Sequence, residues 1–231
     1  MKALVFAAGR GERMRPLTDA TPKPLLTVGG KPLIAWHLEK LAASGIRDVV
    51  INTSWLAEQF PRALGDGSQW GLRIAYSYEG DTPLETGGGM LHALPLLRDA
   101  SGADEPFIAV NGDVWSDYDF AQLPREPAGL AHVVVVPLPE FRQPGPFEQA
   151  LATLLPSDAD LHTLAGIGIY RPSLLDGVAP ERFSIVPHLV EAIGTGQLTT
   201  EILSGCWWDV GTPERLAELD RSIPTLRREK R

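Results

Sequence analysis

The sequence contains a single cysteine, Cys206, among its 231 residues. One thiol cannot form an internal disulfide or supply a cysteine metal cluster, so both kinds of site are excluded. A chain of this length buries enough apolar surface to fold without a covalent or metal cross-link. We therefore expect a fold that is stabilised by an ordinary hydrophobic core.

Positive charge is also scarce. Lys and Arg number 21 against 29 Asp and Glu, which gives a formal net charge of −8. Nucleic-acid affinity comes mainly from cations that neutralise phosphates, so we expect no binding to DNA or RNA. The lysines are Lys2, Lys23, Lys31, Lys40 and Lys230. Any phosphate chemistry that needs a lysine must therefore use the N-terminal segment.

Long hydrophobic runs are missing as well. The chain has no uninterrupted apolar stretch near the length of about 20 residues that a membrane-spanning helix needs. The apolar run 3–8 resembles the start of a signal peptide, but it ends at Gly9 and is followed by Arg10, Glu12 and Arg13. We therefore expect no membrane association and a cytoplasmic location.

Short apolar runs alternate with segments of helical periodicity. Strands are predicted at 3–8, 49–51, 72–76, 107–110, 133–136, 167–170 and 198–203. Helices are predicted at 32–43, 56–64, 90–97, 185–193 and 213–219. The alternation predicts an α/β, Rossmann-like, doubly wound fold with a mostly parallel central sheet and an elaborated second half in a single domain. Residues 147–163 show no clear pattern.

A glycine-rich segment follows the first predicted strand. Gly9 and Gly11 allow backbone N–H groups to approach phosphate oxygens, and Arg13 and Lys23 supply positive charge. The segment matches neither the Rossmann fingerprint, which needs a third glycine where Met14 stands, nor the Walker loop. The glycines alone fit a phosphate-binding loop or a plain turn equally well. The two cations favour the phosphate-binding loop.

Two aspartates follow predicted strands. Asp113 comes soon after the strand at 107–110, and Asp209 lies at a second strand-to-helix junction. A turn or capping role would explain either aspartate alone. Ligands bind at the carboxyl edge of open α/β sheets, and two carboxylates with phosphate oxygens suit Mg²⁺. The pair therefore predicts a Mg²⁺ site, whereas Asp117 and Asp119 are expected to be solvated.

The glycine-rich segment is part of a longer pattern. Residues 7–18 read AAGRGERMRPLT and residues 22–25 read PKPL. This stretch resembles the signature of the sugar-1-phosphate nucleotidyltransferases. Three further segments match that family in the same order: LETGGG at 84–89, NGD at 111–113 and WDVGTP at 208–213. The resemblance thus covers nearly the whole chain.

The resemblance implies attack of a sugar 1-phosphate on a nucleoside triphosphate, with release of pyrophosphate and with Mg²⁺ as cofactor. It implies that Arg13 and Lys23 are catalytic and that Asp113 and Asp209 hold the metal. The implied nucleotide-binding residues are Ala7, Ala8, Gly9, Gly11, Arg13, Lys23, Glu79, Glu85 and Gly88. The predicted sugar-binding residues are Asn111, Trp115, Gly168 and Trp208.

Residues 1–231 are expected to form one catalytic domain, in which 1–113 mainly bind the nucleotide and 114–212 mainly bind the sugar phosphate. No C-terminal β-helix is expected. A phosphate nucleophile is largely ionised at neutral pH because its second pKa is about 6, so no strong general base is required. The five histidines form no recognisable pair, and each is expected at the surface or as an ordinary helix residue.

Within the family, the segments 83–89 and 110–120 most resemble the N-acetylmuramate-1-phosphate uridylyltransferases of cell-wall recycling, which use UTP. The chain shares with them the lack of a Glu-Lys-Pro lysine that holds the sugar phosphate in many relatives, and Arg142 is a candidate replacement. The lactyl carboxylate of this sugar favours a roomy pocket with aromatic walls. Trp115 and Trp208 are candidates for such walls, and two core tryptophans are the alternative.

Several other functions stay open from the sequence. A mannose-1-phosphate guanylyltransferase, or another enzyme that makes a nucleotide-sugar, would keep the fold and the reaction. A non-catalytic sensor of nucleotide-sugars would usually have lost Lys23, Asp113 or Asp209, and all three are present. A metal-dependent glycosyltransferase would not need the loop 9–23. The sequence leaves the oligomeric state open.

Overall fold

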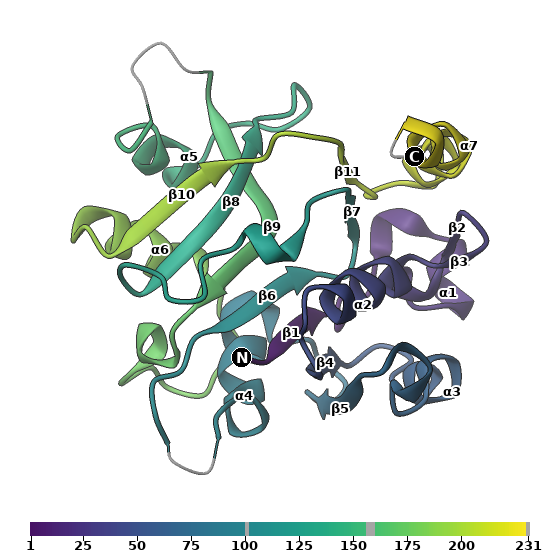
Figure 1. The fold of residues 1–231 in the computed structure, drawn as a ribbon, viewed down its shortest axis with the longest axis horizontal. Coiled ribbons are helices and arrows are strands. Elements are labelled where there is room, and N and C mark those ends of the chain that lie inside the picture. Colours follow the sequence, from purple (N-terminus) through teal and green to yellow (C-terminus); the bar gives the residue numbers. More distant parts are fainter. Residues whose placement is uncertain (100–101, 156–159, 230–231) are drawn as a thin grey trace.

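The computed structural model describes residues 1–99, 102–155 and 160–229 (Figure 1). A seven-stranded sheet has the order β10-β8-β9-β6-β1-β4-β5. Its strands are β1 (Ala3–Phe6), β4 (Asp48–Thr53), β5 (Arg73–Tyr78), β6 (Phe107–Asn111), β8 (Ala131–Pro137), β9 (His162–Tyr170) and β10 (Leu198–Ile202). β9 runs antiparallel to β6 and β8, and the other neighbouring strands are parallel. The predicted α/β fold with a mostly parallel sheet is confirmed.

Helices cover both faces of this sheet (Figure 1). The α-helices of the described residues are α1 (Leu17–Ala20), α2 (Leu33–Ala43), α3 (Gln59–Leu64), α4 (Glu85–Leu97), α5 (Pro146–Leu151), α6 (Val186–Gly194) and α7 (Pro213–Glu229). α2 and α3 pack on one face, and α4, α5 and α6 pack on the other. The sheet is therefore doubly wound, as the alternating sequence pattern predicted.

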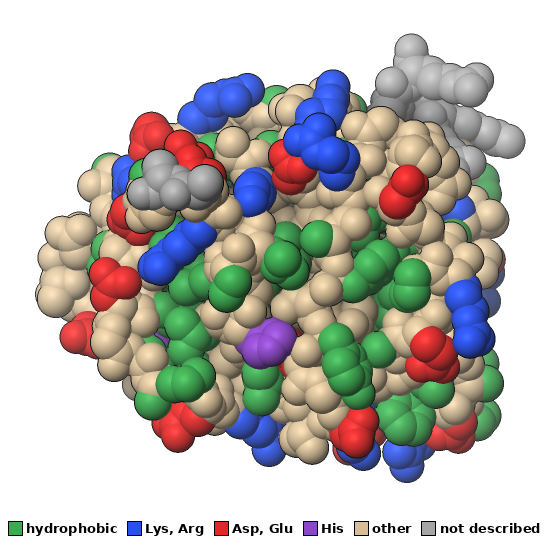
Figure 2. Space-filling view, turned by 90° about the horizontal axis from the view of Figure 1, so that it is seen from below, with side chains coloured by type: hydrophobic (Ala, Val, Ile, Leu, Met, Phe, Trp, Pro, Cys, Tyr) green, Lys and Arg blue, Asp and Glu red, His purple; other side chains and the backbone are tan. Residues whose placement is uncertain are grey.

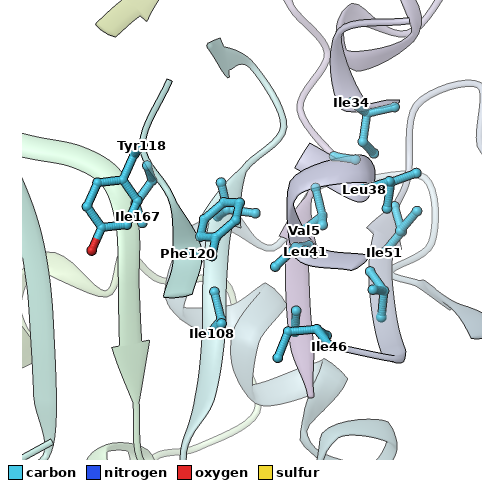
Figure 3. Close-up of a cluster of buried hydrophobic side chains, with 14 of the residues drawn as sticks. Val5, Ile34, Leu38, Leu41, Ile46, Ile51, Ile108, Tyr118, Phe120 and Ile167 are labelled. Carbon is cyan, nitrogen blue, oxygen red and sulfur yellow. The ribbon is translucent and has the colours of Figure 1, made fainter. Parts of the chain in front are cut away.

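Strand β1 lies in the interior of the sheet, between β6 and β4. Successive side chains of a strand point to opposite faces, and β1 is apolar on both. Val5 joins the cluster under α2, whereas Leu4 joins the cluster under α4. Figure 3 shows Val5 and Ile51 beside Leu38 of α2. A strand of this kind is buried on both sides, which places the loop after it at the carboxyl edge of the sheet.

Two small antiparallel pairs lie outside the main sheet. β2 (Thr27–Val28) pairs with β3 (Lys31–Pro32), and β7 (Val114–Ser116) pairs with β11 (Trp207–Asp209). A third apolar cluster joins them to α7, with Leu219 and Ile223 of that helix fully or almost fully buried. The amide of Gly29 also donates to Asp220 Oδ1 at 2.7 Å. The last helix therefore packs against the N-terminal part of the chain.

Several local predictions were wrong. α7 continues beyond residue 219. α4 begins at Glu85, five residues before the helical periodicity at 90–97, and it agrees with the helix that the family resemblance places at 84–89. The unassigned stretch 147–163 contains most of α5 and the start of β9, and its residues 156–159 lie outside the described part. Short 3₁₀ turns at Glu12–Met14, Lys23–Leu25, Ser68–Trp70, Phe120–Gln122 and Pro172–Leu175 were not predicted.

Some polar residues are more buried than expected. His132 and His162 are buried on strands, and His37 is fully buried inside α2. Asp117 is half-buried, and its Oδ1 accepts the amide of Cys206 at 2.9 Å, so it is not simply solvated. Asp119 is exposed, as expected, and caps a 3₁₀ turn. These side chains stabilise tertiary contacts that the sequence pattern did not indicate.

The surface mixes apolar and charged groups. On the face seen in Figure 2, hydrophobic side chains gather around a central histidine, and charged side chains of both signs lie toward the rim. Across the described residues, no helix combines the length and the apolar character that crossing a bilayer requires.

Candidate active site

A cavity of about 700 Å³ opens where β1, β4, β5 and β6 end. Because the carboxyl ends of parallel strands meet at one edge of a sheet, residues far apart in sequence converge there. Ten predicted residues line it: Ala7, Ala8, Gly9, Gly11, Arg13, Lys23, Glu79, Glu85, Asn111 and Asp113. Arg10, Asn52, Thr82 and Arg182 also line it and were not predicted. Gly88, Trp115, Gly168, Trp208 and Asp209 are not among its lining residues.

The glycine loop turns sharply at Gly11, where φ is 63°. A Cβ at this position would lie 2.9 Å from Thr18 Cγ2 and 3.2 Å from Lys23 Cβ. The Thr18 hydroxyl donates to the carbonyl oxygen of Gly11 at 2.8 Å and so closes the loop. In contrast, a Cβ on Gly9 would meet no atom within 4 Å. The loop is therefore held at Gly11 and faces open space at Gly9, where a ligand can approach the backbone.

Lys23 is held in the site by an ion pair. It begins a 3₁₀ turn, and its side chain is only 7% exposed. Its Nζ donates to Asp113 Oδ2 at 2.8 Å, and the side chain of Asp113 is 41% exposed. A buried ammonium group needs a charged partner, and this carboxylate supplies it. The pair connects the N-terminal segment to the end of β6.

Asp209 reaches the same region through the β7–β11 ribbon. The amide of Val210 donates to the carbonyl oxygen of Asp113 at 3.2 Å. Arg215 Nη1 lies 3.3 Å from Asp209 Oδ2. A Cβ on Gly211 would lie 3.4 Å from both Arg13 Nη1 and Asp209 Oδ1. Gly211 therefore leaves room for the approach of these groups, and Arg215 is a neighbour that the sequence analysis missed.

The two aspartates carry the kind of oxygen ligand that Mg²⁺ favours. Mg²⁺ favours oxygen ligands and usually keeps several waters or substrate phosphates beside one or two carboxylates. Within the described ranges, no group of three or more His, Cys, Asp or Glu side chains is placed to hold a metal. A metal held by Asp113 and Asp209 would thus need further oxygens from a phosphate substrate or water, and the binding of one ion by both residues stays a prediction.

A chain of hydrogen bonds joins β1, β4, β5 and α4 at the cavity. The amide of Ala7 donates to Asn52 Oδ1 at 2.7 Å, and Asn52 Nδ2 donates to Glu79 Oε1 at 2.5 Å. The amide of Leu84 donates to Glu79 Oε2 at 2.8 Å. Burial raises the pKa of the Glu79 carboxyl, and these hydrogen bonds partly oppose the rise. A Cβ on Gly89 would lie 2.7 Å from Asn52 Nδ2, so the network needs a glycine there.

The glycines of α4 permit close packing against the segment 181–183. The amide of Gly88 donates to the carbonyl oxygen of Phe183 at 3.1 Å, and a Cβ on Gly88 would lie 2.5 Å from Glu181 O. Glu85 has a φ of 64°, and its carboxylate pairs with Arg182 at 2.8 Å. The structure therefore brings Arg182 to the cavity, and the contact of Gly88 with a base remains a prediction.

The structure corrects the prediction of aromatic walls. Trp115 is only 5% exposed and packs edge-to-face with Trp36 at 5.9 Å between ring centroids. Neighbouring residues of a strand point to opposite sides, so Trp208 faces away from Asp209. Trp208 borders a separate hollow beneath α7 instead. Neither ring is a wall of the main cavity.

Gly168 also lies away from the cavity. It sits inside the sheet opposite Ala109, and a Cβ there would lie 2.9 Å from the carbonyl oxygen of His132. Gly166 is nearer to the edge, where a Cβ would lie 2.9 Å from the side-chain amide nitrogen of Asn111. Gly166 is therefore the glycine that adjoins Asn111, one of the residues that line the cavity.

Arg142 was the candidate replacement for the missing lysine. Its Nη2 lies 3.8 Å from Glu148 Oε1, and it is not among the residues that line the cavity. Glu148 accepts from Thr163 Oγ1 at 2.6 Å and from the Gly145 amide at 2.8 Å. Burial acts to raise the pKa of the Glu148 carboxyl, but these hydrogen bonds outweigh it and lower the pKa. The role of Arg142 stays a prediction.

Comparison with known proteins agrees with this geometry. The model of the nucleotidyl transferase family matches residues 2–140. The chain is 44% identical to the N-acetylmuramate alpha-1-phosphate uridylyltransferase of Neisseria meningitidis, over 94% of this chain and 96% of that protein. It is 33% identical to the mannose-1-phosphate guanyltransferase of Schizosaccharomyces pombe over 93% of this chain, and it spans 62% of that protein.

A solved structure shows the same fold. The structure, from Bacillus anthracis and described as a glucose-1-phosphate thymidylyltransferase, has a TM-score of 0.81 and 21% identity. The match covers 96% of this chain and 94% of that chain. The family model, the sequence relatives and the cavity at the end of the parallel strands lead to one conclusion: the chain belongs to the nucleotidyl transferase family.

Proposed function

We propose that this protein transfers a uridylyl group from UTP to N-acetylmuramate 1-phosphate, giving UDP-N-acetylmuramate and pyrophosphate. The identity of 44% to the Neisseria meningitidis uridylyltransferase, over 94% of this chain, carries the proposal. A cavity of about 700 Å³ has the size of a small-molecule site. Two residues with proposed catalytic roles, Arg13 and Lys23, line it.

The reaction needs positive charge more than proton transfer. The second pKa of a phosphate monoester is about 6, so the sugar phosphate is mostly ionised at neutral pH. One of its oxygens attacks the α-phosphorus of UTP, and the bond from that phosphorus to the pyrophosphate oxygen breaks. Both reactants are anions, so the site must align them and neutralise their charge.

The cations in and beside the cavity suit that task. Arg10, Arg13, Lys23 and Arg182 all line it, although the chain as a whole is acidic. In the proposed reaction, Lys23 and Arg13 bind the phosphates of UTP. Mg²⁺ held by Asp113 and Asp209 would supply further positive charge to the phosphate oxygens.

The sugar phosphate needs a partner in place of the missing lysine. Two arginines are better placed than Arg142. Arg182 lines the cavity, and Arg215 lies beside Asp209. N-acetylmuramate 1-phosphate carries a lactyl carboxylate in addition to its phosphate, so a site with arginines suits it.

A second candidate is a mannose-1-phosphate guanylyltransferase. Besides the Schizosaccharomyces pombe protein, the mannose-1-phosphate guanylyltransferase of Mycobacterium tuberculosis is 32% identical over 97% of this chain and 67% of that protein. This activity would use the same fold and the same cations. It differs from the first proposal in the base and in the sugar.

A pyrophosphate-release assay tests both candidates. The assay crosses UTP, CTP, GTP, ATP and dTTP with N-acetylmuramate, mannose, glucose and N-acetylglucosamine 1-phosphates in the presence of Mg²⁺. We expect the highest kcat/KM for UTP with N-acetylmuramate 1-phosphate. A higher kcat/KM for GTP with mannose 1-phosphate would overturn the first proposal in favour of the second.

A further inference from the structure

The two aspartates of the proposed metal site lie on a ribbon that is separate from the main sheet. Asp113 directly precedes β7, and Asp209 ends β11 opposite Val114. Among the strands of the described residues, β7 and β11 pair with each other and not with the seven-stranded sheet. The strand ladder of that sheet therefore ends before the ribbon. Two single hydrogen bonds still connect them, from the Gly112 amide to the carbonyl oxygen of Phe6 at 2.9 Å and from Trp207 Nε1 to that of Ala165 at 2.8 Å. Its position must depend on the groups that contact it.

Helix α2 contacts the backbone of β7 at both ends. His37 Nε2 donates to the carbonyl oxygen of Val114 at 2.8 Å. Lys40 Nζ donates to the carbonyl oxygen of Ser116 at 2.8 Å. Residues three apart on a helix share one face, so both side chains point to the same strand. The helix itself is anchored on the main sheet through residues such as Leu38, which Figure 3 shows beside Val5 and Ile51.

Packing alone does not explain a histidine at position 37. Its side chain is 0% exposed, and burial, with a smaller contribution from Lys40, lowers the pKa of the imidazole to about 3. The ring is therefore neutral at pH 7. A carbonyl oxygen can only accept, so the single ring proton is on Nε2.

The other ring nitrogen is left without a partner. His37 Nδ1 has no hydrogen-bond partner within the described part of the chain. Burial of an unsatisfied polar atom opposes folding, so an apolar residue would fill this space at a lower cost in free energy. The feature that distinguishes histidine from an apolar residue here is its hydrogen bond to Val114.

We propose that His37 is a positioning residue for the aspartate pair. Its hydrogen bond fixes the backbone at Val114, next to Asp113, and the ribbon transmits this position to Asp209. Lys40 fixes the other end of β7. The inference rests on the proposed function, because it assumes that Asp113 and Asp209 bind one Mg²⁺. Without the hydrogen bond, the separation of the two carboxylates varies and the metal binds more weakly.

Two substitutions at position 37 test the inference. His37→Leu fills the space but removes the donor, whereas His37→Gln keeps an N–H near the position of Nε2. Mn²⁺ serves as the probe, and its binding is measured by electron paramagnetic resonance with a UTP analogue that cannot be cleaved between the α- and β-phosphates. We expect His37→Leu to weaken Mn²⁺ binding about tenfold or more, as loss of a group that supports metal ligands does. His37→Gln should retain affinity to within about threefold of the wild type.

His132→Leu is the matched control. His132 is also a buried histidine, but it lies on β8 and its Nδ1 is 2.8 Å from Thr199 Oγ1. This variant should lower the Tm and leave Mn²⁺ affinity unchanged. An equal loss of Mn²⁺ affinity in His132→Leu and His37→Leu would overturn the inference, because general destabilisation would then explain it. If His37→Leu does not fold, His37→Met carries the test, because methionine also fills the space without a donor, and unchanged Mn²⁺ affinity in that variant would overturn the inference.

The wild-type measurement separates this inference from the proposed function. Failure of the wild-type protein to bind Mn²⁺ with the UTP analogue would overturn the proposed metal site and, with it, the inference. Wild-type binding together with equal binding by His37→Leu would overturn the role of His37 alone. Loss of Mn²⁺ affinity in His37→Leu, together with retained affinity in His37→Gln, would support both the proposed metal site and the role of His37.

Discussion

Replacement of Lys23 by methionine removes the ammonium group that lies beside Asp113 and keeps the aliphatic chain that is buried in the 3₁₀ turn. The side chain of Lys23 is 7% exposed, so alanine would leave a cavity in addition to the lost charge. Methionine separates the two effects. The variant therefore measures the contribution of the positive charge to catalysis.

The structure sets the expected cost in stability. At 2.8 Å, two unit charges attract by about 1.5 kcal/mol in water and by about 6 kcal/mol at an effective dielectric constant of about 20. The side chain of Asp113 is 41% exposed, so water screens the pair and the lower end applies. We expect the free energy of unfolding to fall by about 1–2 kcal/mol, which lowers the Tm by roughly 2–8 °C.

The expected cost in catalysis is larger. Loss of one contact that stabilises charge in a transition state typically lowers kcat by about 10²–10³. Pyrophosphate release at saturating substrates measures this change. Lys31→Met is the matched control, because Lys31 pairs with Glu39 outside the cavity and its loss should leave kcat unchanged. A kcat near the wild-type value for Lys23→Met would refute the role on the phosphates.

Metal binding without nucleotide distinguishes two ways in which Lys23 could act. If Lys23 only orients Asp113, then Lys23→Met should weaken Mn²⁺ binding. If Lys23 acts on the phosphates, Mn²⁺ binding should be unchanged or tighter, because a competing cation has been removed from the carboxylate. We expect unchanged or tighter Mn²⁺ binding in Lys23→Met. Rescue of the kcat of this variant by excess Mg²⁺ would contradict a role of Lys23 on the phosphates.

The other predictions concern three features of the site. Asp113→Asn and Asp209→Asn should each abolish Mg²⁺-dependent pyrophosphate release, and additive losses in the double variant would mean that they do not share an ion. Gly89→Ala should raise the KM for UTP and lower the free energy of unfolding by about 1–3 kcal/mol, whereas Gly194→Ala, whose new Cβ would meet no atom within 4 Å in helix α6, should not lower the Tm and should raise it slightly. Because the pKa of His37 falls from 6.5 to about 3 on folding, the unfolded state takes up a proton first as the pH drops below about 6.5. This group should thus lower the unfolding free energy by about 1.4 kcal/mol per pH unit, and urea denaturation of His37→Gln between pH 6 and 4.5 should show a slope that is smaller by that amount.

The parts of the site that were predictable are local in sequence. A buried strand that ends in glycine places the next residues at the sheet edge, so Gly9 and Gly11 could be placed without knowledge of tertiary structure. The same reasoning placed Asp113 after β6, and both expectations agree with the cavity lining. The sequence predicted a mostly parallel sheet but not the order of its strands. The antiparallel β9 starts in a stretch without periodicity, so its pairing could not be predicted.

The residues that were missed depend on long-range packing. Arg182 reaches the cavity because the glycines of α4 allow the segment 181–183 to pack closely, and no spacing in the sequence encodes that contact. The prediction that Trp208 forms a wall of the cavity could have been avoided from the sequence. Successive strand residues point to opposite sides, so if Asp209 faces the metal site, Trp208 faces away from it.

The ion pairs of the site suggest how an acidic chain accommodates two anionic substrates. Lys23 pairs with Asp113, and Arg215 pairs with Asp209, so each proposed metal ligand has a cation beside it. A divalent cation at the carboxylates would compete with both side chains, and the displaced cations would then be available to phosphate oxygens. The side-chain cations would lose a carboxylate partner when the metal binds and gain a phosphate partner when the nucleotide binds. Binding of the metal would therefore favour binding of the triphosphate, and binding of the triphosphate would favour binding of the metal. The ion pairs Lys23–Asp113 and Arg215–Asp209 would then take part in binding, and the small number of lysines would not limit the positive charge that the substrates meet.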